Sequence, residues 1–486
     1  MLFFENYSFK NFYIFKQKKN IKIFFVLSLV SMTLEMLGIG LIMPFLSILI
    51  EPIYSEKFMN YINNFGFNLI TQEDLIIFSI ISILCVFFIK TMFLSYVAFQ
   101  QTKFLINLKT EVSNKLFKIY LLKPFVFHLN NNSSKLIRDL NDSNFILAVT
   151  KSILTLITEI ILVIGIVSLM IFVEPMGTII SFLFIYLTGY LFYLIVQRKA
   201  SKWGQDRKRH EGIKLQWLQQ GFSSIKDIKI MNKFNYFIES FSKQNKLTND
   251  TQFKQDFTLS LPRHWLELFT VIGFTILLFI IISFNEEVVD VIPILGLFAA
   301  AAFRIMPSIT RIMNSFQSIK FGFPVAKTYI KEFLDFDKKI EYNDNIKKIQ
   351  FKDSIELINV SYTYPDTNRK ILNNINIKIP FGNSIGIFGD SGVGKSTLLS
   401  VFLQLLKPQS GKIILDGEDT ANFTRQWQNI MGYVPQNVYL NDDTLMKNIA
   451  LGVNEDQIDI KKINEVTKRL KLDKFIKSLK DGFHTK

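Results

Sequence analysis

The stretch Ser384–Lys407, SIGIFGDSGVGKSTLLSVFLQLLK, places a β-prone run, a glycine-rich loop and a helical pattern in direct succession. Its middle part, GDSGVGKST at Gly389–Thr397, has the spacing of a loop that wraps around phosphate groups. A strand before the loop and a helix after it form the context that such a site requires. The stretch therefore predicts an α/β domain that holds a nucleotide.

Each residue type in this loop has a physical role toward phosphate. Glycines let backbone N–H groups approach the anion at the positive end of the following helix. Lys395 brings a point charge to the β- and γ-phosphates, Ser396 offers a hydroxyl to Mg²⁺, and Thr397 adds a contact to the α-phosphate. The predicted loop consists of Gly389, Asp390, Ser391, Gly392, Val393, Gly394, Lys395, Ser396 and Thr397.

The sequence around this loop has the pattern of a soluble α/β domain from residue 351 to 486, after a charged linker at 331–350. Short β-rich runs separated by turn residues predict its strands. These runs are Ser354–Val360, Asn374–Ile379, Ser384–Phe388, Lys412–Leu415 and Ile430–Val434.

The chain before the linker has the composition of a membrane protein. The whole sequence is 49% hydrophobic with 49 Phe, its net charge is +15, and its mean hydropathy is +0.25. A basic soluble protein would suggest nucleic acid as a partner, but here the basic residues lie in particular loops between apolar runs. We therefore expect a bilayer partner and no nucleic acid. The single cysteine, Cys85, excludes an internal disulfide.

Apolar segments in residues 1–330 approach or reach the ~20 residues that a helix needs to cross the bilayer. The first follows a basic stretch, but it is too long for a signal peptide and lacks a small-residue cleavage site, so we predict a retained span. The six predicted spanning helices cover about 23–50, 75–99, 150–173, 177–196, 266–284 and 288–313.

The distribution of Lys and Arg predicts the orientation of these spans. The 22 N-terminal residues carry five Lys, and the connections 100–149 and 197–263 are also rich in Lys and Arg. The connection 51–74 has only Lys57, and 174–177 has neither Lys nor Arg. Because basic loops stay on the cytoplasmic side, both termini and the nucleotide domain are predicted to be cytoplasmic.

The two long basic connections contain stretches with helical periodicity. We expect the spanning helices to continue well beyond the bilayer, with short connecting elements near Phe127–Asn132 and Ser223–Ile228. Separate amphipathic helices lying on the membrane surface are the alternative.

Charged residues also interrupt the apolar runs, and each costs about 2.5–3.5 kcal/mol at a helix centre unless it meets a partner or water. One hypothesis is that Arg304 and Arg311 line a cavity open to the cytoplasm and meet an anionic group of a substrate. The alternative is that they pair with acidic residues and hold helices together. The interrupting residues identified are Glu35, Glu159, Glu267, Arg304 and Arg311.

Two stretches of the second domain resemble ATP-binding cassette (ABC) domains. NVSYTYPDTNRKILNNINIKIPFGNSIGIFGDSGVGKSTLL, from Asn359, is similar to the opening of such a cassette, and the resemblance implies that Tyr364 stacks on adenine. GYVPQNVYLNDDTLMKNIALG, from Gly432, is similar to the family's Q-loop region. The resemblance implies that Gln436 contacts Mg²⁺ and the attacking water.

With the helical domain ahead of it, the chain resembles an ABC exporter half-transporter over essentially its whole length. Three stretches resemble flippases of lipid-linked oligosaccharides of the PglK type. The resemblance implies a homodimer in the bacterial inner membrane, ATP and Mg²⁺ as cofactors, and Glu35, Arg304 and Arg311 as substrate residues. The matching stretches are LEMLGIGLIMPFLSIL from Leu34, LPRHWLELFTVIGF from Leu261 and FRIMPSITRIMNSF from Phe303.

The final residues, DGFHTK at Asp481–Lys486, resemble the segment that shortly precedes the LSGGQ-type signature of ABC cassettes. That signature, the Walker B aspartate, the catalytic glutamate and the switch histidine do not occur in these 486 residues, and His484 precedes the signature region. We therefore interpret the cassette as C-terminally incomplete, and expect this length of chain to bind ATP without hydrolysing it. Two alternatives stay open: an ABC exporter of a peptide, drug or lipid, and an inactive nucleotide-binding membrane fragment.

Overall fold

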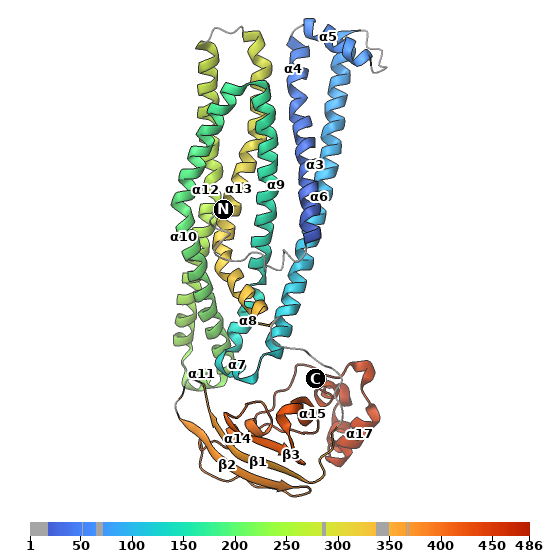
Figure 1. The fold of residues 1–486 in the computed structure, drawn as a ribbon, viewed down its shortest axis with the longest axis vertical. Helices are drawn as coiled ribbons and strands as arrows, with labels where there is room; N and C mark the ends of the chain where they lie inside the picture. Colours follow the sequence, from blue (N-terminus) through green and yellow to red (C-terminus); the bar gives the residue numbers. More distant parts are fainter. Residues whose placement is uncertain are drawn as a thin grey trace. The chain divides into compact units, whose positions relative to one another are not determined.

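The computed structural model describes residues 18–50, 52–64, 71–283, 288–336, 349–365, 367 and 369–486. The chain divides into two compact units, Met1–Tyr342 and Asn343–Lys486. The first unit is helical, and the second contains a small sheet with short helices. Each unit is described by itself below (Figure 1).

Long helices build the first unit, because its apolar runs continue into polar sequence with helical periodicity, and internal prolines at 262, 293, 307 and 324 do not end the helices that contain them. Helices of about 50 residues reach about 75 Å at 1.5 Å per residue, far more than the ~30 Å hydrocarbon layer. The predicted extension beyond the bilayer is therefore confirmed, and separate surface helices are excluded for α6, α10 and α12. The long helices are α3 (Lys18–Gly40), α6 (Gln72–Leu122), α9 (Ser143–Val173), α10 (Pro175–Ser223), α12 (Phe234–Ser283) and α13 (Val288–Phe336).

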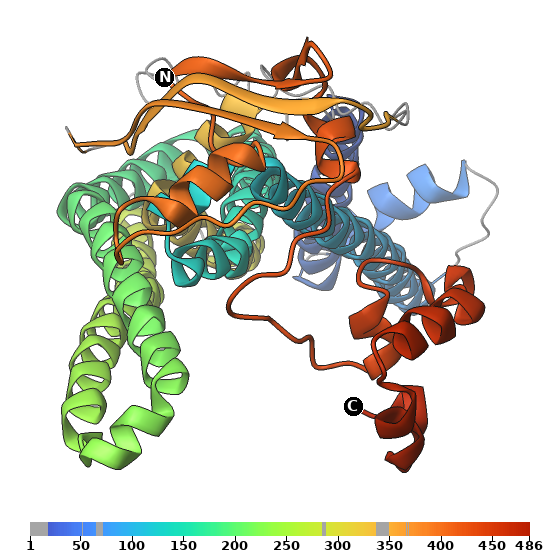
Figure 2. The same ribbon diagram turned by 90° about the horizontal axis from the view of Figure 1, so that it is seen from below.

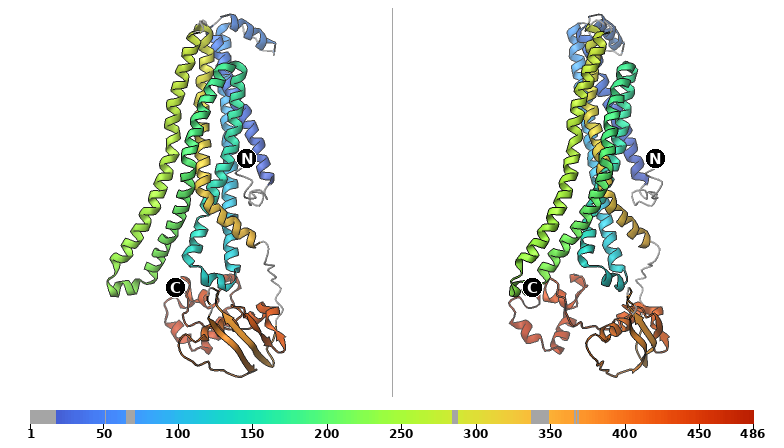
Figure 3. Two further views of the ribbon diagram at one scale, coloured as in Figure 1. Left: turned by 60° about the vertical axis from the view of Figure 1, so that its left-hand side comes forward. Right: turned by 90° about the vertical axis from the view of Figure 1, so that its left-hand side faces the viewer.

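Short helices connect the long ones. Helix α7 (Phe125–Asn130) and α11 (Ile225–Met231) lie where the sequence predicted short connecting elements. Figure 3 shows α11 closing the hairpin of α10 and α12, which run side by side. The remaining short helices are α4 (Ile42–Ile50), α5 (Pro52–Asn63) and α8 (Ser133–Asn141).

Local signals fix where several of these helices begin. The Thr71 side chain accepts a hydrogen bond from the Asp74 backbone N–H, and the Asp74 carboxylate accepts one from the Thr71 N–H. This reciprocal cap satisfies backbone donors that the first turn of α6 leaves free. Pro175 occupies the first turn of α10, where proline costs no hydrogen bond, so the predicted tight hairpin at 174–177 brings α9 and α10 together.

Four helical stretches among the described residues are long and apolar enough to cross a membrane: Lys22–Ile50, Gln72–Leu122, Ser133–Val173 and Ile292–Ile330. The predicted spans 177–196 and 266–284 lie in α10 and α12, where several side chains are outside the described set. Residue 284, the last residue of the predicted span 266–284, lies outside the described residues.

Buried apolar clusters hold the described part of this helical unit together, and helix α13 contributes to two of them. One joins α3, α9 and α13 through Ile39, Ile166 and Leu297. The other joins α6, α9 and α13 at their far ends through Leu116, Ile146 and Val325. Helix α13 contributes to both clusters, so its position is fixed along most of its length.

The second unit contains an antiparallel sheet in the order β2-β1-β3-β4, which Figure 2 shows face-on beside short helices. Trp427 is 1% exposed and donates its indole N–H to the Phe402 carbonyl, so it fastens α15 to α14. The elements are β1 (Ser354–Thr363), β2 (Lys370–Pro380), β3 (Ser410–Leu415), β4 (Glu418–Asp419), α14 (Lys395–Phe402), α15 (Thr424–Asn429), α16 (Leu445–Ile449), α17 (Ile460–Arg469) and α18 (Asp473–Ser478).

Two predicted strands are wrong. The runs Ser384–Phe388 and 431–434 are irregular, Ile430 caps the end of α15, and neither predicted strand forms a ladder with the described residues. Phe388 is 93% exposed and Val434 is 87% exposed, so neither side chain packs into a core. A β-prone run becomes a strand only when neighbouring strands accept its backbone hydrogen bonds. The runs at β1, β2 and β3 have such neighbours and are strands, as predicted.

Candidate functional site

The loop before α14 has the backbone conformation that phosphate binding requires. Gly392 and Gly394 have φ angles of 84° and 106°, a region that residues with a Cβ rarely adopt. At Gly394 a Cβ would also lie 2.8 Å from the Ile371 side chain, so the loop has no room for one. The chain then enters α14 at Lys395, and the first N–H groups of this helix face the loop.

The lysine of this loop lies across its backbone. Lys395 Nζ donates to the carbonyl oxygens of Gly389 and Asp390, at 2.6 and 2.8 Å. These contacts hold the ammonium group inside the loop, where an incoming phosphate would compete with two neutral carbonyls. A charged oxyanion is the stronger acceptor, so the arrangement fits a phosphate ligand.

Tyr364 reaches the same loop from the end of β1. Its hydroxyl is 3.1 Å from Thr397 Oγ1, and its ring packs edge-to-face on Tyr362 at 5.2 Å between centroids. The structure therefore brings together Tyr364, Lys395 and Thr397, which the sequence assigned to one nucleotide site. Gln436 is exposed in an irregular segment, and among the described residues no hydrogen bond joins it to the loop.

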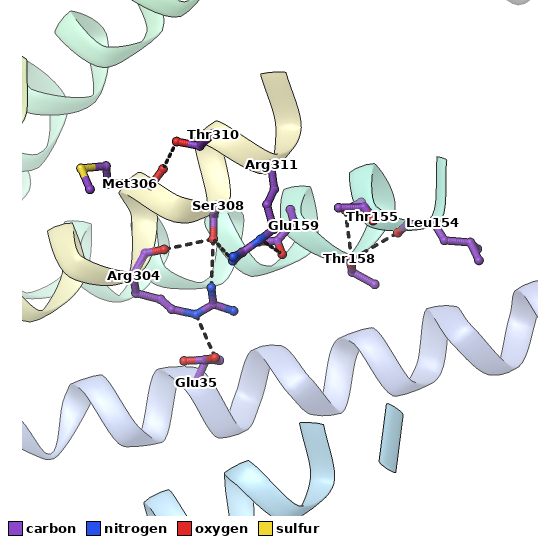
Figure 4. Close-up of polar contacts among 10 residues, drawn as sticks. All are labelled: Glu35, Leu154, Thr155, Thr158, Glu159, Arg304, Met306, Ser308, Thr310 and Arg311. Carbon is purple, nitrogen blue, oxygen red and sulfur yellow. Dashed lines mark hydrogen bonds and ion pairs between the residues drawn. The ribbon is translucent and has the colours of Figure 1, made fainter. Parts of the chain in front are cut away.

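A second group of polar residues lies inside the helical unit (Figure 4). Glu35 on α3 has only 3% of its side chain exposed and binds two cations with separate oxygens. Its Oε1 accepts from Arg304 Nε on α13 at 2.8 Å, and its Oε2 accepts from Lys90 Nζ on α6 at 3.1 Å. One buried carboxylate therefore joins three helices.

Glu159 on α9 binds the second arginine of α13. Its two oxygens accept from Arg311 Nε at 2.5 Å and from Arg311 Nη2 at 3.2 Å. Ser308 is fully buried between the two arginines, and its hydroxyl accepts from Arg304 Nη1 at 3.3 Å and from Arg311 Nη2 at 3.5 Å. The set Glu35, Lys90, Glu159, Arg304, Ser308 and Arg311 is called the charge network below.

Comparison with known proteins covers both units. Residues 24–306, more than half of the chain, match the ABC transporter transmembrane region, and residues 372–483 match the ABC transporter family. This chain belongs to the ABC transporters. The helical unit is their transmembrane region, and the unit with the small sheet contains their nucleotide-binding domain.

Relatives of this ABC transporter chain include ATP-dependent lipid A-core flippases. The one from Methylococcus capsulatus is 24% identical over 77% of this chain and 62% of its own length. The one from Escherichia coli K12 is 36% identical over 27% of this chain and 22% of its own length. ABC transporter B family member 6 of Dictyostelium discoideum is 33% identical over 30% of this chain and 23% of its own length. The chain thus spans less than two thirds of each of these relatives.

A solved structure described as a bacterial Atm1-family ABC exporter with ATP bound is similar in fold. It superposes with a TM-score of 0.71 over 94% of this ABC transporter chain and 78% of the other, at 17% identity. At that identity the match shows the exporter fold, and it carries no information on the transported substrate.

In this ABC transporter chain, both arginines that the sequence singled out have carboxylate partners. The pairs are Arg304 with Glu35 and Arg311 with Glu159, whereas Glu267 is exposed on α12 and takes no part in the network. Lys90 was not among the charged residues predicted to matter, although it interrupts an apolar run just as they do. Its partner lies 55 residues earlier, which no local pattern indicates.

Proposed function

We propose that this chain belongs to an exporter half-transporter that uses ATP to move a lipid-anchored anion across the membrane. The observation that carries the proposal is the combination, in one chain, of a glycine-rich loop of the phosphate-binding type with helices that hold two partly exposed arginines against buried carboxylates. The loop supplies the nucleotide site, and the arginines supply a place for negative charge inside the membrane domain.

The residues of the loop fit ATP with Mg²⁺. The proposal assigns Lys395, whose ammonium group lies in the loop, to the β- and γ-phosphates, and the exposed residue Ser396 to Mg²⁺. Tyr364 offers an aromatic face to adenine, and Gln436 is the proposed contact to Mg²⁺ and water. The nucleotide, when bound, supplies the free energy of phosphoryl transfer. The chain's own part is to bind and orient it through Gly389–Thr397 and Tyr364.

The proposed substrate is a lipid-linked oligosaccharide or polysaccharide precursor. Arg304 and Arg311 suit a phosphate or pyrophosphate, because the planar guanidinium group binds two oxygens at once. The relatives named lipid A-core flippases favour a lipid anchor over a soluble cargo. An exporter of a peptide, a drug or another lipid is the alternative that the same fold allows.

The proposed arrangement in the cell follows from the fold and the basic loops. The transmembrane domain occupies 1–330 with six spans, 331–350 forms the linker, and 351–486 belongs to the nucleotide-binding domain. Both termini lie in the cytoplasm, and the membrane is the inner membrane of a bacterium. The working form is a homodimer, since a half-transporter has one membrane domain and one cassette.

Flipping in proteoliposomes tests the substrate part of the proposal. Arg304→Gln should abolish flipping of a fluorescent lipid-linked oligosaccharide and leave crosslinking of photo-reactive ATP unchanged, because the network and the loop are separate sites. Lys395→Ala is the matched control, and it should lose the crosslink. Unchanged flipping by Arg304→Gln refutes the substrate site. Because the signature and the Walker B aspartate do not occur in these 486 residues, this length of chain should crosslink ATP without hydrolysing it faster than Lys395→Ala does, and absence of the crosslink in the unaltered chain refutes the nucleotide site.

A further inference from the structure

Both arginines of the charge network are already neutralised by carboxylates of the chain itself. Glu35 and Glu159 have 3% and 11% of their side chains exposed, whereas Arg304 and Arg311 have 23% and 42% exposed. The carboxylates are thus the more deeply buried members, and the arginines present their other side outward. Any anion that approaches Arg304 or Arg311 meets a cation that already has a counterion.

The network nevertheless carries an excess of positive charge. Lys90, Arg304 and Arg311 contribute three cations against the two carboxylates of Glu35 and Glu159. Among the described residues, Arg304 Nη2 and Arg311 Nη1 have no hydrogen-bond partner, and both guanidinium groups lie within 3.5 Å of Ser308 Oγ. Both guanidinium groups therefore meet at Ser308, and each keeps one nitrogen that makes no hydrogen bond with a described residue.

The two carboxylates hold their cations with unequal geometry. Glu159 uses both oxygens on the single guanidinium of Arg311, which is the strong bidentate arrangement. Glu35 divides its oxygens between Arg304 and Lys90, so it makes one contact with each. Arg304 is therefore the arginine whose present counterion is the easier one to replace.

From this geometry we infer that Glu35 is a built-in competitor that sets the charge an anionic substrate must carry. The inference rests on the proposed function, since it concerns the same site. A singly charged anion only balances the excess charge of the network and leaves Glu35 bound to Arg304. A doubly charged phosphate or pyrophosphate brings enough charge to balance the network and also to take Arg304 from Glu35.

Low dielectric inside the helical unit makes this competition strong, because charges at contact distance interact more strongly there than in water. When Glu35 is replaced by neutral glutamine, Arg304 and Lys90 lose their counterion. An added anion can then bind both of these cations. Affinity for a phosphate-bearing anion should then rise. A carboxylate that merely orients Arg304 would have the opposite effect, since its removal would release the guanidinium and lower the affinity.

The test measures binding by the full chain in lipid nanodiscs, in a Lys395→Ala background that removes phosphate binding at the nucleotide loop. The probes are a polyprenyl pyrophosphate, a singly charged polyprenyl phosphodiester and the uncharged polyprenol, with inorganic pyrophosphate added separately. Glu35→Gln should bind polyprenyl pyrophosphate at least about tenfold more tightly and should prefer it less strongly over the phosphodiester. Inorganic pyrophosphate tests whether the ligand is a free anion. Binding of polyprenyl pyrophosphate without binding of inorganic pyrophosphate identifies a lipid headgroup as the ligand, and binding of both identifies the anion itself.

Glu267→Gln is the matched control, because Glu267 is another acidic residue of the helical unit outside the network. It should leave the affinity unchanged. Combining Glu35→Gln with Arg304→Gln should remove most of the gain, because the released cation is then absent. Thermal unfolding of each variant verifies folding, and Glu35→Asp, which keeps the charge and shortens its reach, should show a smaller gain than Glu35→Gln.

The outcomes separate this inference from the proposed function. Binding by the unaltered network with equal or weaker binding by Glu35→Gln overturns the competitor role and leaves the anion site in place. Absence of binding in both proteins overturns the anion site and the competitor role together. If Glu35→Gln does not fold, the smaller gain expected of Glu35→Asp decides in the same way.

Discussion

Gly204 marks the closest approach between α10 and α13, and it gives the strongest prediction for packing. Gly204 is buried, and a Cβ built on it would lie 2.1 Å from the carbonyl oxygen of Phe321 and 2.9 Å from its carbonyl carbon. Because these atoms belong to the backbone of α13, no side-chain rotation can relieve the contact. Gly204→Ala must therefore move one helix relative to the other.

The expected size of the effect combines two opposing contributions. Alanine favours a helix over glycine by about 1 kcal/mol. Overpacking in a close-packed interface costs about 1–3 kcal/mol, and a rigid backbone neighbour puts this site at the upper end. We expect Gly204→Ala to be destabilised by about 2 kcal/mol, which lowers the midpoint of thermal unfolding by about 4 °C.

Gly189 on the same helix provides a matched control. A Cβ at Gly189 meets nothing within 4 Å, so Gly189→Ala should gain the helix propensity without the clash. Since the propensity is common to both variants, the difference in their unfolding midpoints isolates the contact with Phe321. Unfolding of a membrane protein is often irreversible, so both variants are heated at one scan rate in one detergent. Equal midpoints would falsify the close crossing of α10 and α13.

Two further predictions concern the nucleotide unit. Tyr364→Ala should weaken ATP binding by about 1–3 kcal/mol, the range for stacking of a base on an aromatic ring. Tyr364→Phe, which loses only the contact with Thr397 Oγ1, should stay close to the unaltered affinity in a photo-ATP titration. Burial raises the pKa of Asp416, but hydrogen bonds from the backbone N–H groups of residues 352–354 lower it further, so its pKa lies below the ordinary value. These bonds should therefore persist above about pH 4 and weaken as the pH falls through the lowered pKa. Asp416→Asn should speed amide hydrogen exchange at these three residues near neutral pH, relative to their intrinsic rates, and unchanged exchange would exclude the role of this carboxylate.

Sequence patterns correctly predicted the helices and strands whose formation depends on residues near them in the chain. Apolar length predicted the long helices, since a helix satisfies its own backbone hydrogen bonds. Alternation and turn residues predicted β1, β2 and β3. The same signals failed at Ser384–Phe388 and Ile430–Val434, because a strand needs partners that its own residues do not specify. Strand propensity thus predicted strands at two places where the described residues form no ladder.

The two candidate sites also differed in how far local sequence could predict them. The phosphate loop is a local structure of nine residues, so spacing alone located its glycines and Lys395. The charge network joins residues 269 and 152 positions apart, and the sequence offered three acidic residues as partners for two arginines. Only the arrangement of α3, α6, α9 and α13 determines that Glu35 and Glu159 pair, that Glu267 does not, and that Lys90 belongs.

Assembly from four helices makes the charge network sensitive to helix position, which extends the argument about Gly204. Phe321 lies ten residues beyond Arg311 on α13, about 15 Å along the same rigid helix. A shift of α13 that relieves the Gly204→Ala contact therefore also moves the guanidinium groups relative to Glu35 and Glu159, which lie on α3 and α9. Gly204→Ala should alter the affinity for polyprenyl pyrophosphate and lower stability, whereas Gly189→Ala should leave the affinity unchanged. A Gly204→Ala variant that is destabilised but binds the probe normally would show that α10 moves and α13 stays, because the buried clusters on both ends of α13 hold it in place.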